Sequence, residues 1–376
     1  MKFYLTLIFF LLLAACTSFE DTTTSAAVEP VPAPTPTPTP SNIPKNIHQE
    51  YFTPVEVYFA TDRQEEDKSN IKKYFGKERG QMKYGKAVVT IPIVHEPGII
   101  ESPSLWRFEF SEDPEKHIIL FKIDEQNKED FFVNLQFDRL KGSPNDNAFI
   151  YIHGYNVTFE DAAKRTAQIT YDLKFNGTPI FYSWPSNGSI LSYTRDEDNI
   201  EWTKAHLKTF LYDFLTKTEI ENVYLIAHSM GNRALTKAYI ELLNETPEFQ
   251  SRIKEVILAA PDIDAQIFKD QIAPKLVKSS SNLTIYASKR DNALGISKFI
   301  NGHPRVGYAG KYIFIYEGIE TVDSSKIDED FFNHSNYANS LINDLYYIIH
   351  NGLRANERAG LLEMPHRNGV YWEVSK

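Results

Sequence analysis

The sequence contains a single cysteine among its 376 residues, Cys16. One cysteine cannot form an internal disulfide, so the folded part must depend on its hydrophobic core. An excess of positive charge is also missing, because 50 Asp and Glu outnumber 40 Lys and Arg and give a formal net charge of −10. That balance excludes the basic surface by which proteins bind nucleic acid. The charged run at residues 62–73 lacks the ligand spacing and the glycine of a calcium-binding loop, and we predict a solvated loop there.

The N-terminus has the features of an export signal. Lys2 precedes an apolar run at residues 3–13, which is too short to span a membrane and has the length of a signal peptide. The sequence Leu-Ala-Ala-Cys at residues 13–16 follows and resembles the lipobox of bacterial lipoproteins, whose cysteine becomes the acylated first residue of the mature chain. We therefore predict a lipoprotein signal peptide at residues 1–15 and a lipidated Cys16, with an ordinary secretory signal as the alternative.

A segment rich in Thr, Ser, Ala and Pro comes next. Seven of the 20 prolines lie between Pro30 and Pro44, which favours an extended polyproline II chain. We predict a disordered stalk at residues 16–48 that holds the domain away from a membrane; a ligand of a proline-recognition module is a weaker alternative. Thr17 differs from the aspartate that retains lipoproteins in the inner membrane of enteric bacteria. The predicted location is therefore the outer membrane of a bacterial cell envelope.

Residues 49–376 are predicted to form one domain. Strand-like segments at 55–59, 87–93 and 117–123 come first. After them, strand-like runs at 148–152, 179–183, 223–227, 256–260, 283–287 and 312–316 alternate with helical stretches near 159–175, 199–217, 232–243, 265–277 and 335–350. This alternation predicts an α/β fold with a mostly parallel central sheet, helices on both faces, and reactive groups at the carboxyl ends of the strands.

The most informative motif is Ala227-His-Ser229-Met-Gly231. A predicted strand leads directly to the serine, and an amphipathic helical pattern follows it. This order is that of the nucleophile elbow of α/β hydrolases, a strained strand-to-helix turn in which the positions two before and two after the serine must be small. We predict that Ser229 is a catalytic nucleophile.

An elbow serine needs a histidine base and an acid that orients it, and in this fold they follow the serine in the order acid, histidine. His334 comes after the last predicted parallel strand and just before the closing helix, and is the predicted base; His303 and His350 are alternatives. Asp291 and Asp262 follow two consecutive predicted strands. We predict Asp291 as the acid, with Asp262 as the alternative.

Catalysis of acyl transfer also needs hydrogen-bond donors for the developing oxyanion. The predicted strand at 148–152 ends in His-Gly, which allows the following main chain to approach the serine, so the amides of Tyr155 and Met230 are the predicted oxyanion hole. The predicted substrate-contacting residues around them are His153, Gly154, Asn156, Trp184 and His228. For Trp184, a half-buried side chain in a surface loop is the alternative. Only 20 residues separate Asp262 from Leu283, so no large lid domain is expected.

Several segments together go beyond a generic hydrolase. They are Tyr-Ile-His-Gly-Tyr-Asn at 151–156, Tyr-Ser-Trp-Pro-Ser at 182–186, Ala-His-Ser-Met-Gly-Asn-Arg at 227–233 and Ala-Ala-Pro-Asp at 259–262. With them the chain resembles a bacterial α/β-hydrolase family of the esterase/lipase superfamily whose function is unknown. The resemblance covers essentially the whole folded part and implies the α/β-hydrolase fold and a serine esterase mechanism, with the nucleophile at Ser229 and the base at His334. It does not distinguish between the two aspartates, and it names no substrate.

These patterns predict a lipid-anchored serine hydrolase that cleaves a small-molecule or lipid-like carboxylic ester through an acyl-enzyme on Ser229, without a metal or an organic cofactor. Two alternatives remain at this stage. One is a non-catalytic envelope lipoprotein that uses the hydrolase fold as a binding module. The other is an acyltransferase or amidase with the same triad. The sequence makes no prediction about the oligomeric state.

Overall fold

The computed structural model describes residues 51–142, 146–187, 193–278, 282–289, 303–326 and 338–375, and all of them belong to one compact unit. The predicted signal peptide, Cys16 and the whole of the predicted stalk lie outside the described residues. So do two of the predicted triad residues, Asp291 and His334. Within the described ranges, none of the helices combines the length and the apolar character that crossing a membrane would require.

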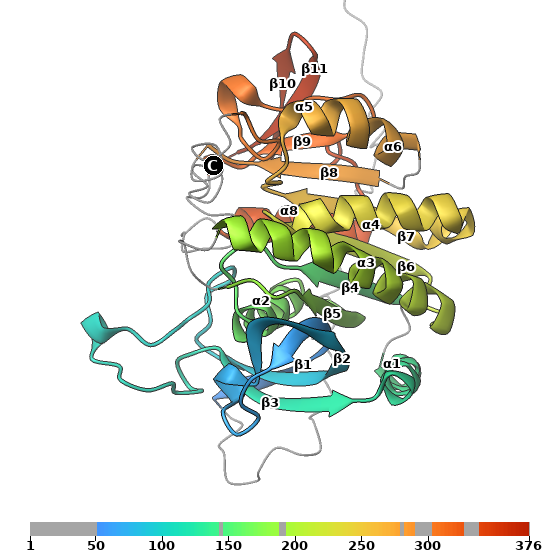
Figure 1. Ribbon diagram of the computed structural model, residues 1–376. Coiled ribbons are helices and arrows are strands. Elements are labelled where there is room, and N and C mark those ends of the chain that lie inside the picture. Colours follow the sequence, from blue (N-terminus) through green and yellow to red (C-terminus); the bar gives the residue numbers. More distant parts are fainter. Residues whose placement is uncertain are drawn as a thin grey trace, which may run out of the picture. The chain divides into compact units, whose positions relative to one another are not determined.

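The strands form one mixed sheet, which runs through the whole domain (Figure 1). In chain order they are β1 (Phe52–Glu65), β2 (Phe75–Pro92), β3 (Ile119–Gln126), β4 (Asn147–Ile152), β5 (Thr178–Ser183), β6 (Asn222–His228), β7 (Ile253–Ala259), β8 (Asn282–Ala287), β9 (Glu320–Asp323), β10 (Leu361–His366) and β11 (Gly369–Val374). Their spatial order is β10-β11-β9-β8-β7-β6-β4-β5-β1-β2-β3. In this spatial order, all neighbouring strands from β11 to β1 are parallel to each other. The pairs β10–β11, β1–β2 and β2–β3, at the two ends of the sheet, are antiparallel. The predicted mostly parallel sheet is confirmed.

Helices cover both faces of this sheet, as the βα alternation predicted. They are α1 (Lys128–Gly142), α2 (Phe159–Asp172), α3 (Tyr193–Lys217), α4 (Gly231–Glu245), α5 (Ala265–Ile267), α6 (Ala273–Lys278) and α8 (Ala338–Asn351). Buried side chains of α1, α3, α4 and α6 share one hydrophobic cluster, and those of α2 and α8 share the other. Successive residues of each strand point to opposite faces, so Ile150 and Leu225 belong to the first cluster and Tyr151 and Ile226 to the second.

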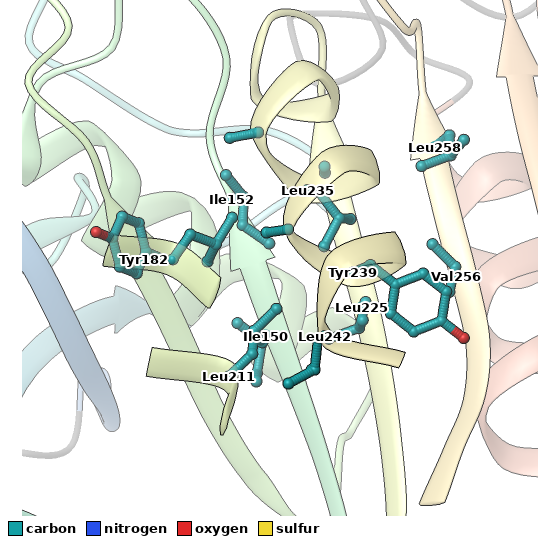
Figure 2. Packing of buried hydrophobic residues seen from close by; sticks show 14 of the residues in the cluster. Ile150, Ile152, Tyr182, Leu211, Leu225, Leu235, Tyr239, Leu242, Val256 and Leu258 are labelled. Carbon is teal, nitrogen blue, oxygen red and sulfur yellow. The ribbon is translucent and has the colours of Figure 1, made fainter. Parts of the chain in front are cut away.

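The helix α4 shows how sequence periodicity fixes this packing. Leu235, Tyr239 and Leu242 recur at helical spacing and point from α4 toward the central strands, where Ile150 and Leu225 lie (Figure 2). All five side chains are at most 1% exposed. The helix α4 is thereby packed against β4 and β6.

One predicted strand is wrong. Residues 312–316 do not form a strand, and the parallel neighbour of β8 is β9 instead. Gly310 has a φ of 76° and opens a 3₁₀ turn (Gly310–Tyr312), in which the Ile313 N–H donates to the Gly310 carbonyl. Ile313 and Phe314 are buried nevertheless, so their apolar run reflects packing in an irregular segment. The hairpin β10–β11 and the helix α1 were not predicted.

The predicted absence of a large lid agrees with the described connection between β7 and β8. It contains only α5, a π-helical segment (Phe268–Ile272) and α6, with residues 279–281 outside the described ranges. The parallel register aligns the ends of the central strands, because Ile152 pairs with both Tyr182 and Ala227, and His228 pairs with Ala259. The loops that follow β4, β5, β6 and β7 therefore meet at one edge of the sheet.

Candidate active site

Ser229 stands in the tight turn between β6 and α4. Its φ of 49° is unusual for a residue with a β-carbon and marks a strained position, as the elbow motif predicted. The Ser229 N–H donates to the Ala259 carbonyl at 2.9 Å, and the Ser229 carbonyl accepts from Asn232 Nδ2 at 2.9 Å. Neighbouring strand and helix thus both hold the strained conformation.

The glycines around Ser229 have no room for a side chain. A Cβ on Gly231 would lie 2.4 Å from the His153 carbonyl oxygen, and a Cβ on Gly154 would lie 2.9 Å from the Cβ of Ser229. Gly231 is the small position two residues after the serine, so its contact with β4 explains that requirement. Gly154 brings the predicted oxyanion loop directly against the elbow.

The Ser229 hydroxyl is buried, with the residue 2% exposed, and its Oγ has no hydrogen-bond partner among the described residues. Asp291 and His334 lie outside them, but the segments that lead to both are described. The Ser324 N–H donates to the Ala287 carbonyl at 2.8 Å, and the Lys289 N–H donates to Ser325 Oγ at 2.9 Å. The loops that carry the predicted acid and the predicted base therefore start side by side.

His153 supports the loop after β4, which is the predicted oxyanion loop. The Trp184 N–H donates to His153 Nε2 at 3.1 Å, which makes Nε2 the unprotonated nitrogen, and Nδ1–H donates to the Gly154 carbonyl at 2.8 Å. Burial, together with the positive charge of Arg63, lowers the pKa of His153 well below its usual value. His153 is therefore a neutral imidazole that fixes the direction of the Gly154 peptide.

Trp184 lies behind His153. Its indole is fully buried, stacks on the His153 ring with centroids 5.1 Å apart, and donates from Nε1 to the His153 carbonyl at 2.8 Å. This environment corrects the expectation that Trp184 lines the cleft or lies half-buried in a surface loop. It acts on the site through His153.

The other predicted oxyanion and substrate residues lie at the same edge. Met230 is fully buried directly after the serine, and Tyr155 is 8% exposed, with its ring edge-on to Tyr193 at 5.4 Å. Asn156 is exposed and has a φ of 59°. Burial and the charge of a nearby arginine lower the pKa of His228 to about 3, so His228 is neutral at physiological pH.

Arg63, whose role the sequence did not indicate, ties the loops after β4 and β5 to β1 and β2. The expectation of a solvated loop at residues 62–73 is wrong at its start, because Asp62 and Arg63 belong to β1 and are buried. Arg63 is 2% exposed, and burial lowers its pKa to about 10, so it keeps its charge at neutral pH. Its guanidinium donates to Ser183 Oγ at 2.8 Å and to the carbonyls of Val157 at 2.7 Å, Gly76 at 2.9 Å and Ser186 at 3.1 Å. The loops after β4 and β5 are thereby fixed to the end of β1. Arg63 precedes His153 by 90 residues, so no periodicity or local motif connects the two.

Asp262, the alternative acid, lies beneath the elbow and is 1% exposed. Its Oδ2 accepts from the Tyr193 hydroxyl at 2.6 Å and pairs with Arg233 at 3.1 Å, and its Oδ1 lies 3.3 Å from Arg305 Nε. The Asp262 N–H donates to the Ser229 carbonyl at 3.2 Å. Both carboxylate oxygens are therefore engaged by cationic or hydroxyl donors. Arg233 is the last residue of the segment 227–233 that carries the family resemblance. Its place in that segment was the one feature of the sequence that pointed to this network.

Groups of three or more His, Cys, Asp or Glu side chains in a metal-binding arrangement do not occur within the described part of the chain. The features that the structure does describe are a strained serine between strand and helix, a glycine loop pressed against it and a parallel sheet with helices on both faces. Together they define an α/β hydrolase.

Comparison with known proteins gives the family. The profile of the family described as "Alpha/beta hydrolase of unknown function (DUF900)" matches residues 129–349, and the chain belongs to that family. An uncharacterized protein of Nostoc sp., alr1448, is 28% identical over 134 residues, which cover 29% of this chain and 35% of that protein. The chain thus spans about a third of the length of this curated relative.

Solved structures that match the chain include a predicted CIB-like hydrolase from Thermoplasma acidophilum, with 16% identity, a TM-score of 0.31, and coverage of 55% of this chain and 88% of that one. A fungal esterase from Rhizomucor miehei has 10% identity, a TM-score of 0.34, and coverage of 80% and 84%. Scores this low carry no argument about activity. The assignment as an α/β hydrolase depends on the family match and on the sheet.

Proposed function

We propose that this protein is a serine esterase that cleaves carboxylic esters through an acyl-enzyme. Ser229 Oγ attacks the ester carbonyl, His334 accepts the hydroxyl proton and returns it to the leaving alcohol, and Asp291 orients His334. The main-chain amides of Tyr155 and Met230 stabilise the oxyanion. Water then attacks the acyl-enzyme by the same route and releases the carboxylic acid.

The observation that carries this proposal is the environment of the Ser229 hydroxyl. A buried hydroxyl at a strained φ of 49° is costly unless the position has a function, and Ser229 Oγ has no partner among the described residues. Gly154 leaves the space in front of Ser229 open to main-chain amides, and the rigid imidazole of His153 holds that loop. A non-catalytic binding module would have no need for this strain.

The ion pairs of Asp262, the alternative acid, support the assignment of Asp291 as the triad acid. The Asp262 carboxylate forms ion pairs with Arg233 and Arg305, and these pairs give it a structural role next to the elbow. Asp291 follows β8, two residues after Lys289, whose N–H reaches the segment leading to His334. We therefore retain Ser229, Asp291 and His334 as the proposed triad.

We also propose that the enzyme is exported and anchored through acylated Cys16 to the bacterial cell envelope. The apolar run, the lipobox-like segment and the proline-rich stalk support this location. A Cys16→Ser variant is expected to lose incorporation of labelled palmitate and its membrane association in cells. Incorporation that persists in the variant contradicts the anchor without touching the proposed activity.

Labelling with a fluorophosphonate tests the esterase directly. Wild type should be labelled at Ser229, Ser229→Ala should not be labelled, and the control Ser251→Ala, at an exposed position outside the site, should be labelled at the wild-type rate. A folded wild type that remains unlabelled refutes the serine mechanism. Hydrolysis of esters from acetyl to palmitoyl then gives the chain-length preference, and product analysis with competing alcohols or amines separates an esterase from an acyltransferase.

A further inference from the structure

A cavity that Ser229 does not line lies at the turn of the C-terminal hairpin. Its volume is about 790 Å³, which is within the range of sites for small molecules. Residues of α5, the 3₁₀ turn at Gly310–Tyr312, the segment after it and the β10–β11 turn line this cavity, and Ser229 does not. The family profile ends at residue 349, so the hairpin that covers the cavity lies outside the matched region. We call it the hairpin cavity.

The inner wall of the hairpin cavity is apolar and preformed. Ile313 and Phe314 line it and are 7% and 6% exposed, and the Phe314 ring packs edge-on against Phe268 at 5.1 Å. The hairpin turn is seated on the same wall, because the position of a Cβ on Gly369 would lie 3.4 Å from Ile315 Cγ2. Gly369 has a φ of 134°, which glycine adopts readily. The same glycine therefore allows both the hairpin turn and its close contact with the cavity wall.

The mouth of the hairpin cavity is cationic. Lys269, Lys311 and Arg367 line it and are exposed, and none of them forms an ion pair within 4.0 Å in the described part of the chain. Among the described residues that line the cavity, Asp264 is the only carboxylate, and its Oδ1 accepts from the Gln266 and Ile267 N–H groups at 2.9 Å. Three cationic side chains without an ion-pair partner among the described residues thus line one cavity, and Lys311 Nζ lies 4.8 Å from the centroid of the Tyr312 ring.

We propose that the hairpin cavity binds an amphiphilic anion, with a carboxylate or phosphate head group at Lys269, Lys311 and Arg367 and an apolar chain against Ile313 and Phe314. A neutral ligand would leave the three charges unpaired, and a small inorganic anion would leave the apolar wall in contact with water. Arginine and lysine are the side chains that bind both kinds of oxyanion. The site is separate from the proposed active site, so it does not depend on the esterase activity.

Lysine footprinting on the full-length chain tests this site. Acetylation of Lys269 and Lys311 is followed by mass spectrometry with decanoate or decyl phosphate, and Lys77, an exposed lysine of β2, serves as internal control. Ligand at ten times its Kd should slow labelling of the two cavity lysines about tenfold. Acetate, inorganic phosphate and 1-decanol should give no protection at the same concentration. The tighter of the two decyl probes identifies the preferred head group.

Charge-reversal variants test whether the protection of Lys269 and Lys311 from acetylation comes from probe bound in the hairpin cavity. Arg367→Glu should raise the Kd of the decyl probe about tenfold or more, because it places a negative charge at the mouth. The matched charge reversal Lys77→Glu should leave the Kd unchanged. Ser229→Ala should bind the probe as wild type does, because Ser229 does not line the hairpin cavity. The proposal is overturned if neither probe protects the cavity lysines, if 1-decanol protects them equally, or if Lys77→Glu weakens binding as much as Arg367→Glu.

Discussion

Replacing Asp262 with asparagine separates a structural aspartate from a catalytic one. In the wild type, the carboxylate of Asp262 faces Arg233 and Arg305, whose side chains are only 16% and 6% exposed. Asp262→Asn leaves these largely buried guanidinium groups opposite a neutral amide. Breaking a buried ion pair costs about 3–5 kcal/mol, and we expect the lower end because Arg233 keeps a second partner, Glu197, at 2.8 Å.

The expected change in thermal stability follows from the size of the domain. About 325 folded residues at roughly 2.1 cal/mol/K each give an unfolding entropy near 0.7 kcal/mol/K, so a loss of about 3 kcal/mol lowers Tm by about 4 °C. Asp291→Asn should leave Tm within about 1 °C of wild type but lower kcat by about 10⁴, because the base loses the carboxylate that orients it.

Calorimetry and fluorophosphonate labelling of the two variants, measured side by side, check both expectations. Asp262→Asn should unfold at a lower temperature and still be labelled below its Tm. The reasoning fails if Asp262→Asn keeps the wild-type Tm and loses labelling while Asp291→Asn stays active. That pattern would make Asp262 the triad acid.

Three further predictions concern residues around the site and in the core. Arg63→Gln should slow labelling of Ser229 on the order of 100-fold, because the loops after β4 and β5 lose their common donor; labelling at the wild-type rate would show that Arg63 has no positioning role. Gly231→Ala should lower the free energy of unfolding by about 1–3 kcal/mol in urea titrations, since its Cβ would lie 2.4 Å from the His153 carbonyl oxygen. Burial raises the pKa of Glu255 to about 7, so the native state binds a proton there that the unfolded state has already lost. Stability should therefore fall by up to about 3 kcal/mol as pH rises from about 4.5 through 7, and Glu255→Gln should remove that part of the slope.

The sequence predicted those parts of the fold whose residue periodicity matches the face that they bury in the structure. The strand before Ser229, the helix after it and the small residue at 231 follow from short-range periodicity and sterics, and the structure confirms them. The apolar run at 312–316 gave a wrong strand, because burial alone does not distinguish a strand from an irregular segment packed on the core.

Contacts between residues far apart in the chain were beyond such reasoning. Trp184 is held behind His153 by contacts across a span of 31 residues, and Arg63 reaches His153 across 90. Nothing in the composition of either segment indicates these partners, since they depend on the order in which strands assemble. The roles of Asp291 and His334 in the proposed triad, which lie outside the described residues, stay predictions.

The hairpin at the C-terminus also decides how the sheet ends. As the edge strand, β10 presents Pro365, which has no N–H to offer a neighbouring strand, and the exposed charge of Glu363. A sheet that ended instead on β9 would leave the main-chain groups of Val322 and Asp323, which pair with β11, open to other copies of the chain. The hairpin therefore puts a strand with a proline and an exposed charge at this edge, which disfavours pairing between the sheets of two molecules.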